Sequence, residues 1–147
     1  MSTTVTWGRT APAAVHPGPA RALSVAAASA AAVAVWAIAV PGLGTRLLVR
    51  FGSGNPQTVH VDLVADTALM ACLAGWALLA VLERRTRHAR AIWTAVAIAV
   101  TAASLGLPLS AGITAAAATA LALMHVAVAA VLIPALRYSA TRQGAMA

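Results

Sequence analysis

The stretch VHVDLVADTALMACLAGWALLAVL, residues 59–82, is long and apolar enough to cross a lipid bilayer as one α-helix. An α-helix rises about 1.5 Å per residue, so about 20 residues cross a hydrocarbon core of about 30 Å. Three further stretches share this character and lie at residues 23–40, 91–109 and 113–136. The sequence therefore predicts an all-α integral membrane protein, a four-helix bundle of four transmembrane spans.

The composition leaves little room for anything outside the membrane. Hydrophobic residues make up 61% of the 147 residues, charged residues make up 9%, and the mean hydropathy is +0.87. A soluble domain usually carries about 25% charged residues. We therefore expect one membrane domain at residues 21–137, between a flexible tail at residues 1–20 and a second tail at residues 138–147. The first apolar stretch is long for a signal peptide and lacks a clear cleavage site before Pro41, which favours a retained span.

The positive charge predicts the orientation of the spans. The net charge of +7 comes from ten arginines and no lysine, and four of them lie in ERRTRHAR, residues 83–90. Positive loops stay in the cytoplasm, so both termini of a four-span chain should be cytoplasmic and the chain should be a multi-pass protein of a bacterial plasma membrane. Arginines beside spans contact anionic lipid headgroups, and this explains the charge without a nucleic-acid partner. The residues expected to do so are Arg84, Arg85, Arg87 and Arg90.

The connections between spans differ in length. Residues 41–58 form the longest one, and their glycines and prolines favour turns over regular structure. Residues 106–112 predict a tight outer turn, so the last two spans should form an antiparallel hairpin. Pro134 removes one backbone donor and predicts a kink near the cytoplasmic end of the last span.

Two carboxylates occur in the second span, four residues apart. Ionisable groups in a membrane usually face the bundle interior or water. Asp62, near the outer end, is expected to pair with Arg46 or Arg50 in the outer loop. Asp66 lies deeper, and two roles are open for it. It could bond hydroxyls of the third span such as Thr101 and Ser104, or it could be a proton or cation site.

His125 lies near the middle of the fourth span. A neutral imidazole bonded to a hydroxyl or a backbone carbonyl is one explanation, and a proton-relay partner for Asp66 through a bridging water or hydroxyl is the other. No metal site and no cofactor are expected, because His60 and His125 differ too much in depth to share one ion. The single cysteine, Cys72, excludes an intramolecular disulfide and a CxxC pair.

Smaller features predict how the helices pack. Small residues spaced four apart let helix backbones approach closely, although a compositional bias toward alanine is an equal explanation. Trp36 and Trp93, near span ends, suit interfacial anchoring. Glu83 and Arg87 could form a pair within one helix. The alanines concerned are Ala22, Ala26, Ala30 and Ala34 in the first span and Ala118, Ala122 and Ala129 in the fourth.

Four segments carry a resemblance to a known family. They are PQTV before the second span, GWALLAVLERRTR across its end, IWTAVA opening the third, and LALMHVAVAAVLIPAL through the fourth. Together they resemble an uncharacterised family of small four-span membrane proteins of actinobacteria, over residues 21–136. Met124 with His125, followed by LIP at residues 132–134, is the most distinctive part. The resemblance implies the fold and no activity.

Two classes of function follow. The first is a non-enzymatic structural, accessory or regulatory membrane component, which packs with a second copy or with another membrane protein. The alternative is a small proton-coupled transporter or permease that uses Asp66 and His125. An enzyme is not expected, since no phosphate loop, nucleophile elbow or catalytic carboxylate pair stands out.

Overall fold

Four long helices make up the computed structural model, which describes residues 17–144 and the side chains of residues 18–138. All four are long and apolar enough to cross a membrane, which confirms the all-α, four-helix membrane fold. The first passes directly into a π-helical turn, and the third continues as a short helix after one residue. The elements are α1 (Pro17–Ala37) with the π-helical turn η1 (Ile38–Gly42), α2 (Val61–Arg85), α3 (Ala89–Ser104) with α4 (Gly106–Ala111), and α5 (Ala115–Gly144).

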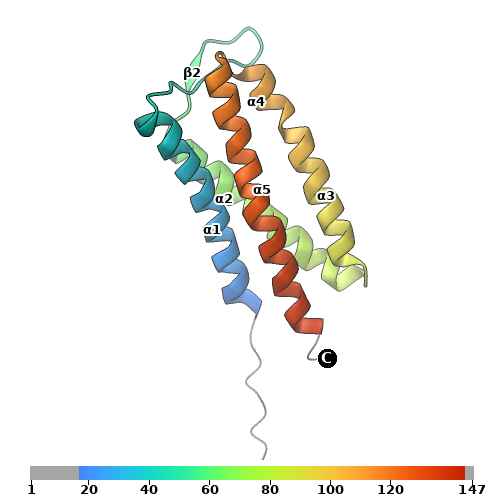
Figure 1. The fold of residues 1–147 in the computed structure, drawn as a ribbon. Coiled ribbons are helices and arrows are strands. Elements are labelled where there is room, and N and C mark those ends of the chain that lie inside the picture. The colour runs from blue at the N-terminus through green and yellow to red at the C-terminus, as the bar shows by residue number, and fades with distance from the viewer. Residues whose placement is uncertain (1–16, 145–147) are drawn as a thin grey trace, which may run out of the picture.

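The helices form a ring in which each packs against two neighbours. α1 packs on α5 and α2, and α3 packs on α2 and α5. Figure 1 shows the start of α1 and the end of α5 at one end of the bundle, and the loop with β2 at the other end. The chain therefore begins and ends its described part on the same side, as an even number of spans requires.

The first helix begins earlier than the sequence predicts. Residues 17–20 were expected to belong to the tail because of Pro17, Gly18 and Pro19, yet α1 starts at Pro17. The first turn of a helix has no intrahelical partners for its N–H groups, so proline removes nothing there and its fixed φ suits the helix. The rest of the predicted tail, residues 1–16, lies outside the described residues.

The last helix also runs further than predicted. α5 continues to Gly144, so most of the predicted tail at residues 138–147 is helical, and residues 145–147 lie outside the described part. Pro134 is contained within this helix. The proline lacks an N–H, so the carbonyl of Ala130, four residues earlier, loses its helical donor at this point.

The loop between α1 and α2 contains regular structure that the sequence did not predict. Strands β1 (Leu48–Val49) and β2 (Gln57–Thr58) pair antiparallel, with Leu48 opposite Thr58. β1 also meets the connection between α4 and α5, because the Arg50 N–H donates to the Ala111 carbonyl (2.9 Å) and the Ile113 N–H donates to the Leu48 carbonyl (3.1 Å). Backbone hydrogen bonds therefore connect the two helical hairpins at this end.

The turn between the last two spans is shorter than the predicted 106–112. Residues 106–111 form α4, so the chain reverses only at residues 112–114. Pro108 sits in the first turn of α4, where it displaces no helical hydrogen bond. A Cβ atom on Gly112 would lie 2.8 Å from backbone atoms of Ala118, so this close approach requires glycine.

The core contains many alanines, but not the ones predicted in the first span, while Ala118, Ala122 and Ala129 of the fourth span are half-buried. Ala22, Ala26, Ala30 and Ala34 are exposed. The neighbouring stripe of α1 is buried instead, and it meets a similar stripe of α5. Small side chains on both helices let α1 and α5 pack closely. Ala32 of α1 clusters with Ala117, Ala120 and Met124 of α5, and Val25 and Ala28 cluster with Leu132 and Leu136 toward the other end.

Candidate functional site

Asp66 faces away from the helix bundle. The buried residues of α2 include Val64, Ala68 and Cys72, and at 100° per residue Asp66 lies almost opposite their face. Its side chain is exposed, although it lies about 7–8 Å along the helix from Val61, inside the second span. Asp66 therefore does not face the bundle interior, where the predicted bonds to hydroxyls of the third span would form. In one copy this carboxylate points out from the helix bundle.

The predicted hydroxyl partners of Asp66 bond their own helix. Thr101 donates to the Ala97 carbonyl (2.8 Å), and Ser104 donates to the Thr101 carbonyl (2.8 Å). A hydroxyl inside a membrane span often satisfies itself this way, because the carbonyl three or four residues earlier is always within reach. The expected hydrogen bonds between Asp66 and the third span are absent among the described residues.

Thr101 also lines a shallow groove between α3 and α5, with a volume of about 460 Å³. The groove is apolar apart from this hydroxyl, and its α5 wall includes Ala130 and Pro134. The proline side chain is exposed there.

His125 is half-buried and bonds within α5. Its Nδ1 lies 2.8 Å from the Leu121 carbonyl, so Nδ1 carries the proton and donates. The bond to a backbone carbonyl is the contact named in the simpler of the two sequence hypotheses. Within residues 17–144, no hydrogen bond connects His125 to Asp66, Thr101 or Ser104. The four predicted site residues are thus not brought together in one copy.

The outer-face ion pair is also absent. Asp62, Arg46 and Arg50 are all exposed, and in the described part of the chain neither arginine lies within salt-bridge distance of Asp62. Two exposed carboxylates, Asp62 and Asp66, therefore occupy one outward side of α2 without a cation from the same copy. The sequence could not show this, because the loop that carries both arginines is held elsewhere by β1 and the turn after α4.

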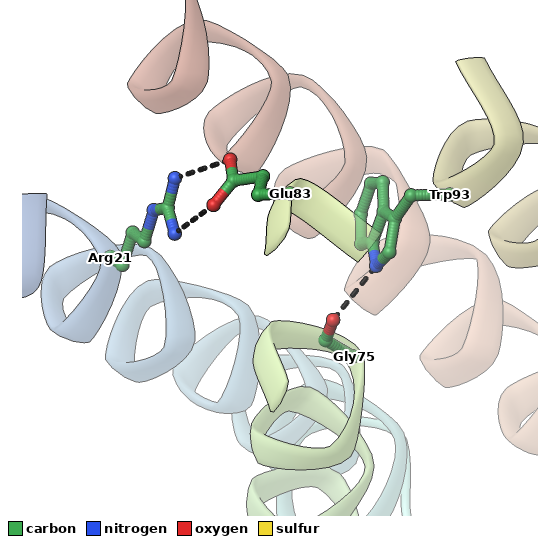
Figure 2. A network of polar contacts seen from close by, with 4 residues as sticks. All are labelled: Arg21, Gly75, Glu83 and Trp93. Carbon is green, nitrogen blue, oxygen red and sulfur yellow. Dashed lines mark hydrogen bonds and ion pairs between the residues drawn. The ribbon is translucent and has the colours of Figure 1, made fainter. Parts of the chain in front are cut away.

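The structure reveals an ion pair that the sequence analysis missed. Arg21 in α1 donates two hydrogen bonds to Glu83 in α2, at 2.9 and 2.7 Å (Figure 2). The Arg21 side chain is 5% exposed and that of Glu83 is 26% exposed. A bidentate pair of this kind fixes both position and angle. It joins the first turn of α1 to the last turn of α2, so Glu83 pairs with Arg21 and not with Arg87 as predicted.

Trp93 lies in the core and does not anchor the chain at the membrane surface. Its side chain is 2% exposed, and its indole N–H donates to the Gly75 carbonyl in α2 at 2.8 Å (Figure 2). This bond joins α3 to α2, whereas the Arg21–Glu83 pair joins α1 to α2. A tryptophan three residues from a charged loop is ambiguous in sequence, since both an interfacial and a core position suit the indole.

The basic loop remains free for contact with a surface. Arg84, Arg85, Arg87 and Arg90 are all exposed at the end of the bundle where α2 passes into α3. Among residues 17–144, no three His, Cys, Asp or Glu side chains lie close enough together to hold a metal ion. The arrangement offers exposed charges at both ends of the bundle and a packed interior between them.

Comparison with known proteins gives one match. The model of a family of unknown function, DUF6069, matches residues 12–142. The chain belongs to the DUF6069 family. No curated protein and no solved structure matches it.

The DUF6069 match spans all four transmembrane helices and every polar group described above. This confirms the part of the resemblance that implied an uncharacterised family, while the actinobacterial origin stays a prediction. The DUF6069 chain is accordingly a multi-pass membrane protein of unknown activity, and the geometry of its own side chains has to carry any functional argument.

Proposed function

We propose that this DUF6069 protein is a non-enzymatic accessory or regulatory component of a bacterial plasma membrane, which associates laterally with another membrane protein or a second copy through α2. The observation that carries the proposal is the exposure of Asp62 and Asp66 on the outward side of a transmembrane helix. A carboxylate at the centre of a span costs about 2.5–3.5 kcal/mol in insertion experiments, and less toward the interface. A hydrogen-bond donor or an arginine on a partner helix would remove this penalty.

The rest of the exposed side of α2 suits helix packing. Asp66, Met70, Leu73 and Ala77 follow one another at spacings of four, three and four residues, and all four are exposed. This spacing places them on one stripe of the helix, as in the contact seams of helical bundles. We call these four residues the α2 stripe. A single polar group within an apolar seam would fix the partner and its alignment.

An accessory role also agrees with where the other polar groups are used. His125, Thr101 and Ser104 bond carbonyls of their own helices, and Arg21 and Glu83 bond each other. The first three groups satisfy their own helices, the ion pair joins α1 to α2, and little is left for chemistry. A transport role would need Asp66 and His125 to share one path, and their positions in one copy do not support that arrangement.

The proposed orientation follows from the basic loop. With Arg84, Arg85, Arg87 and Arg90 exposed at one end, we place that end and both termini in the cytoplasm, with these arginines against anionic headgroups. In this orientation the α2 stripe begins near the outer surface of the membrane. A second copy or another membrane protein would contact it there.

Site-specific photocrosslinking tests the proposal. A benzophenone amino acid at Met70, which is 66% exposed on the α2 stripe, is compared with one at Val100, which is 62% exposed on α3. We expect a discrete protein crosslink from position 70 and none from position 100. Two differently tagged copies distinguish self-association from a different partner.

Asp66→Leu in the position 70 background then tests the carboxylate itself. The substitution should weaken the crosslink, because the polar contact that selects the partner is gone. Equal crosslinking from positions 70 and 100, or none from position 70 in native membranes, would show that the α2 stripe faces lipid and would refute the proposal.

A further inference from the structure

A cleft with both apolar and polar side chains in its walls lies at the loop end of the bundle, separate from the α2 stripe. It has a volume of about 500 Å³. Its walls come from the chain just after η1, from β1, and from the segment between β2 and α2. The lining residues that matter here are Trp36, Thr45, Arg46, Leu47, Thr58 and His60. We call this the outer cleft.

The outer cleft sits at the boundary between membrane and water. Thr45 and Arg46 come directly after the first span, which ends at Gly42, and Thr58 and His60 come directly before the second, which begins at Val61. Both segments therefore lie at the depth of lipid headgroups, where phosphate groups are concentrated. The depth of the cleft relative to the membrane is thus inferred from where the first span ends and the second begins.

Polar side chains and an apolar floor meet in this cleft. Leu47 is 1% exposed, and Trp36 is held in place because its indole N–H donates to the Val59 carbonyl (3.2 Å). The polar side chains of Thr45, Arg46, Thr58 and His60 have no hydrogen-bond or ion-pair partner within the described residues. Two hydroxyls, one guanidinium and one imidazole thus offer donors to a ligand.

The charge of the cleft selects an anion. Arg46 is its one arginine, and no carboxylate is among the residues that the structure places around it. Guanidinium binds phosphate oxygens through two parallel hydrogen bonds, and hydroxyls supplement such sites. The apolar floor suits a ligand with an apolar part beside its anionic group.

We propose that the outer cleft binds a phosphate group, with Arg46 as the charged contact and Thr45, Thr58 and His60 as further donors. The source of the phosphate is either the headgroup of an anionic phospholipid or a soluble organic phosphate. The lipid satisfies both the donors and the apolar floor. This inference rests on the cleft and not on the association of α2 with a partner.

Native mass spectrometry of the full chain in neutral detergent tests the proposal. The probes are dioleoylphosphatidylglycerol and dioleoylglycerol, which share the same acyl chains and differ in the phosphate headgroup. We expect one molecule of the phospholipid to bind and the neutral lipid to bind at least about tenfold more weakly, a ratio that corresponds to about 1.4 kcal/mol. Equal binding of the two lipids would overturn the proposal.

A matched pair of variants assigns the contact. Arg46→Gln and Arg50→Gln remove the same charge from the same loop, but only Arg46 lines the cleft. We expect the first to weaken phospholipid binding about tenfold and the second less than about twofold. Equal losses would show a general charge effect and refute the site. Thr58→Val, which leaves the charge unchanged, should weaken binding about threefold and serves as the second test if the arginine variant does not fold.

A soluble probe separates the two sources of phosphate. Glycerol 3-phosphate is titrated into the parent and into Arg46→Gln without added lipid. Binding of the phospholipid alone identifies a lipid site, whereas binding of glycerol 3-phosphate by the parent but not by the variant identifies a site for a soluble phosphate. Failure of both probes to distinguish the parent from Arg46→Gln contradicts the proposal.

Discussion

The ion pair between Arg21 and Glu83 predicts unequal effects when either partner is removed. Glu83→Gln leaves the Arg21 guanidinium, which is 5% exposed, without its counter-charge, and its Nε already lacks a hydrogen-bond partner. Breaking a buried pair typically destabilises a protein by about 3–5 kcal/mol. Because the Glu83 side chain is 26% exposed, we expect the lower end of this range, about 3 kcal/mol.

The reverse change should be milder. Arg21→Met leaves a carboxylate that can reach water, so we expect a loss of about 1 kcal/mol, as for pairs that are accessible to solvent. The double variant Arg21→Met with Glu83→Gln removes both charges and should lie within about 1 kcal/mol of the parent, because neither charge is then left buried without its partner.

Unfolding by dodecyl sulfate in mixed micelles, followed by tryptophan fluorescence, gives these free energies. Trp93 supplies a core signal because its indole is buried between α2 and α3. Arg84→Gln, an exposed arginine next to Glu83, is the control and should change the free energy of unfolding by less than about 0.5 kcal/mol. The reasoning fails if Arg21→Met destabilises the protein as much as Glu83→Gln, or if the double variant equals the sum of the two single ones.

Three further predictions concern packing and topology. Gly112→Ala should lower the midpoint of thermal unfolding, because its new Cβ would lie 2.8 Å from the backbone of α5, whereas Gly106→Ala, with nothing within 4 Å, should leave it unchanged or raise it. Trp93→Phe removes the hydrogen bond to the α2 carbonyl and should lower the free energy of unfolding in dodecyl sulfate titrations by about 1–3 kcal/mol. Ser53→Cys in the outer loop should react with a membrane-impermeant maleimide on intact cells and Thr86→Cys should not; the opposite pattern would invert the topology.

Hydropathy predicted the number of helices and their approximate limits, because a bilayer imposes its thickness on any helix that crosses it. The predicted ends of the helices were wrong where local backbone chemistry determines where a helix begins or ends. Pro17 and Pro19 suggested a tail, but proline is harmless in a first helical turn. β1 was invisible because two-residue strands carry no periodicity. Such strands exist here because a distant turn supplies their hydrogen-bond partners.

The polar residues were harder to place than the helices. Hydrogen bonds from Asp66 to the third span were one expectation, because ionisable groups in a membrane usually face the bundle interior or water. The apolar residues Val64, Ala68 and Cys72 face the interior instead, and this places Asp66 on the opposite side of α2. Glu83 was assigned to Arg87, four residues away, since the alternative partner lies 62 residues earlier in the chain. Short-range spacing can rank partners within one helix, whereas pairing across the bundle depends on how the helices pack.

The backbone ties of β1 to its two neighbours form at different stages of synthesis. β1 has β2 on one side and the turn after α4 on the other, and the second contact needs residues 111–113. During synthesis the first two spans emerge before that segment exists, so the Leu48 carbonyl and the Arg50 amide wait for their partners until the last hairpin inserts. A chain truncated before residue 111 would keep this strand edge open. The backbone ties at this end therefore distinguish a chain that contains residues 111–113 from a shorter one.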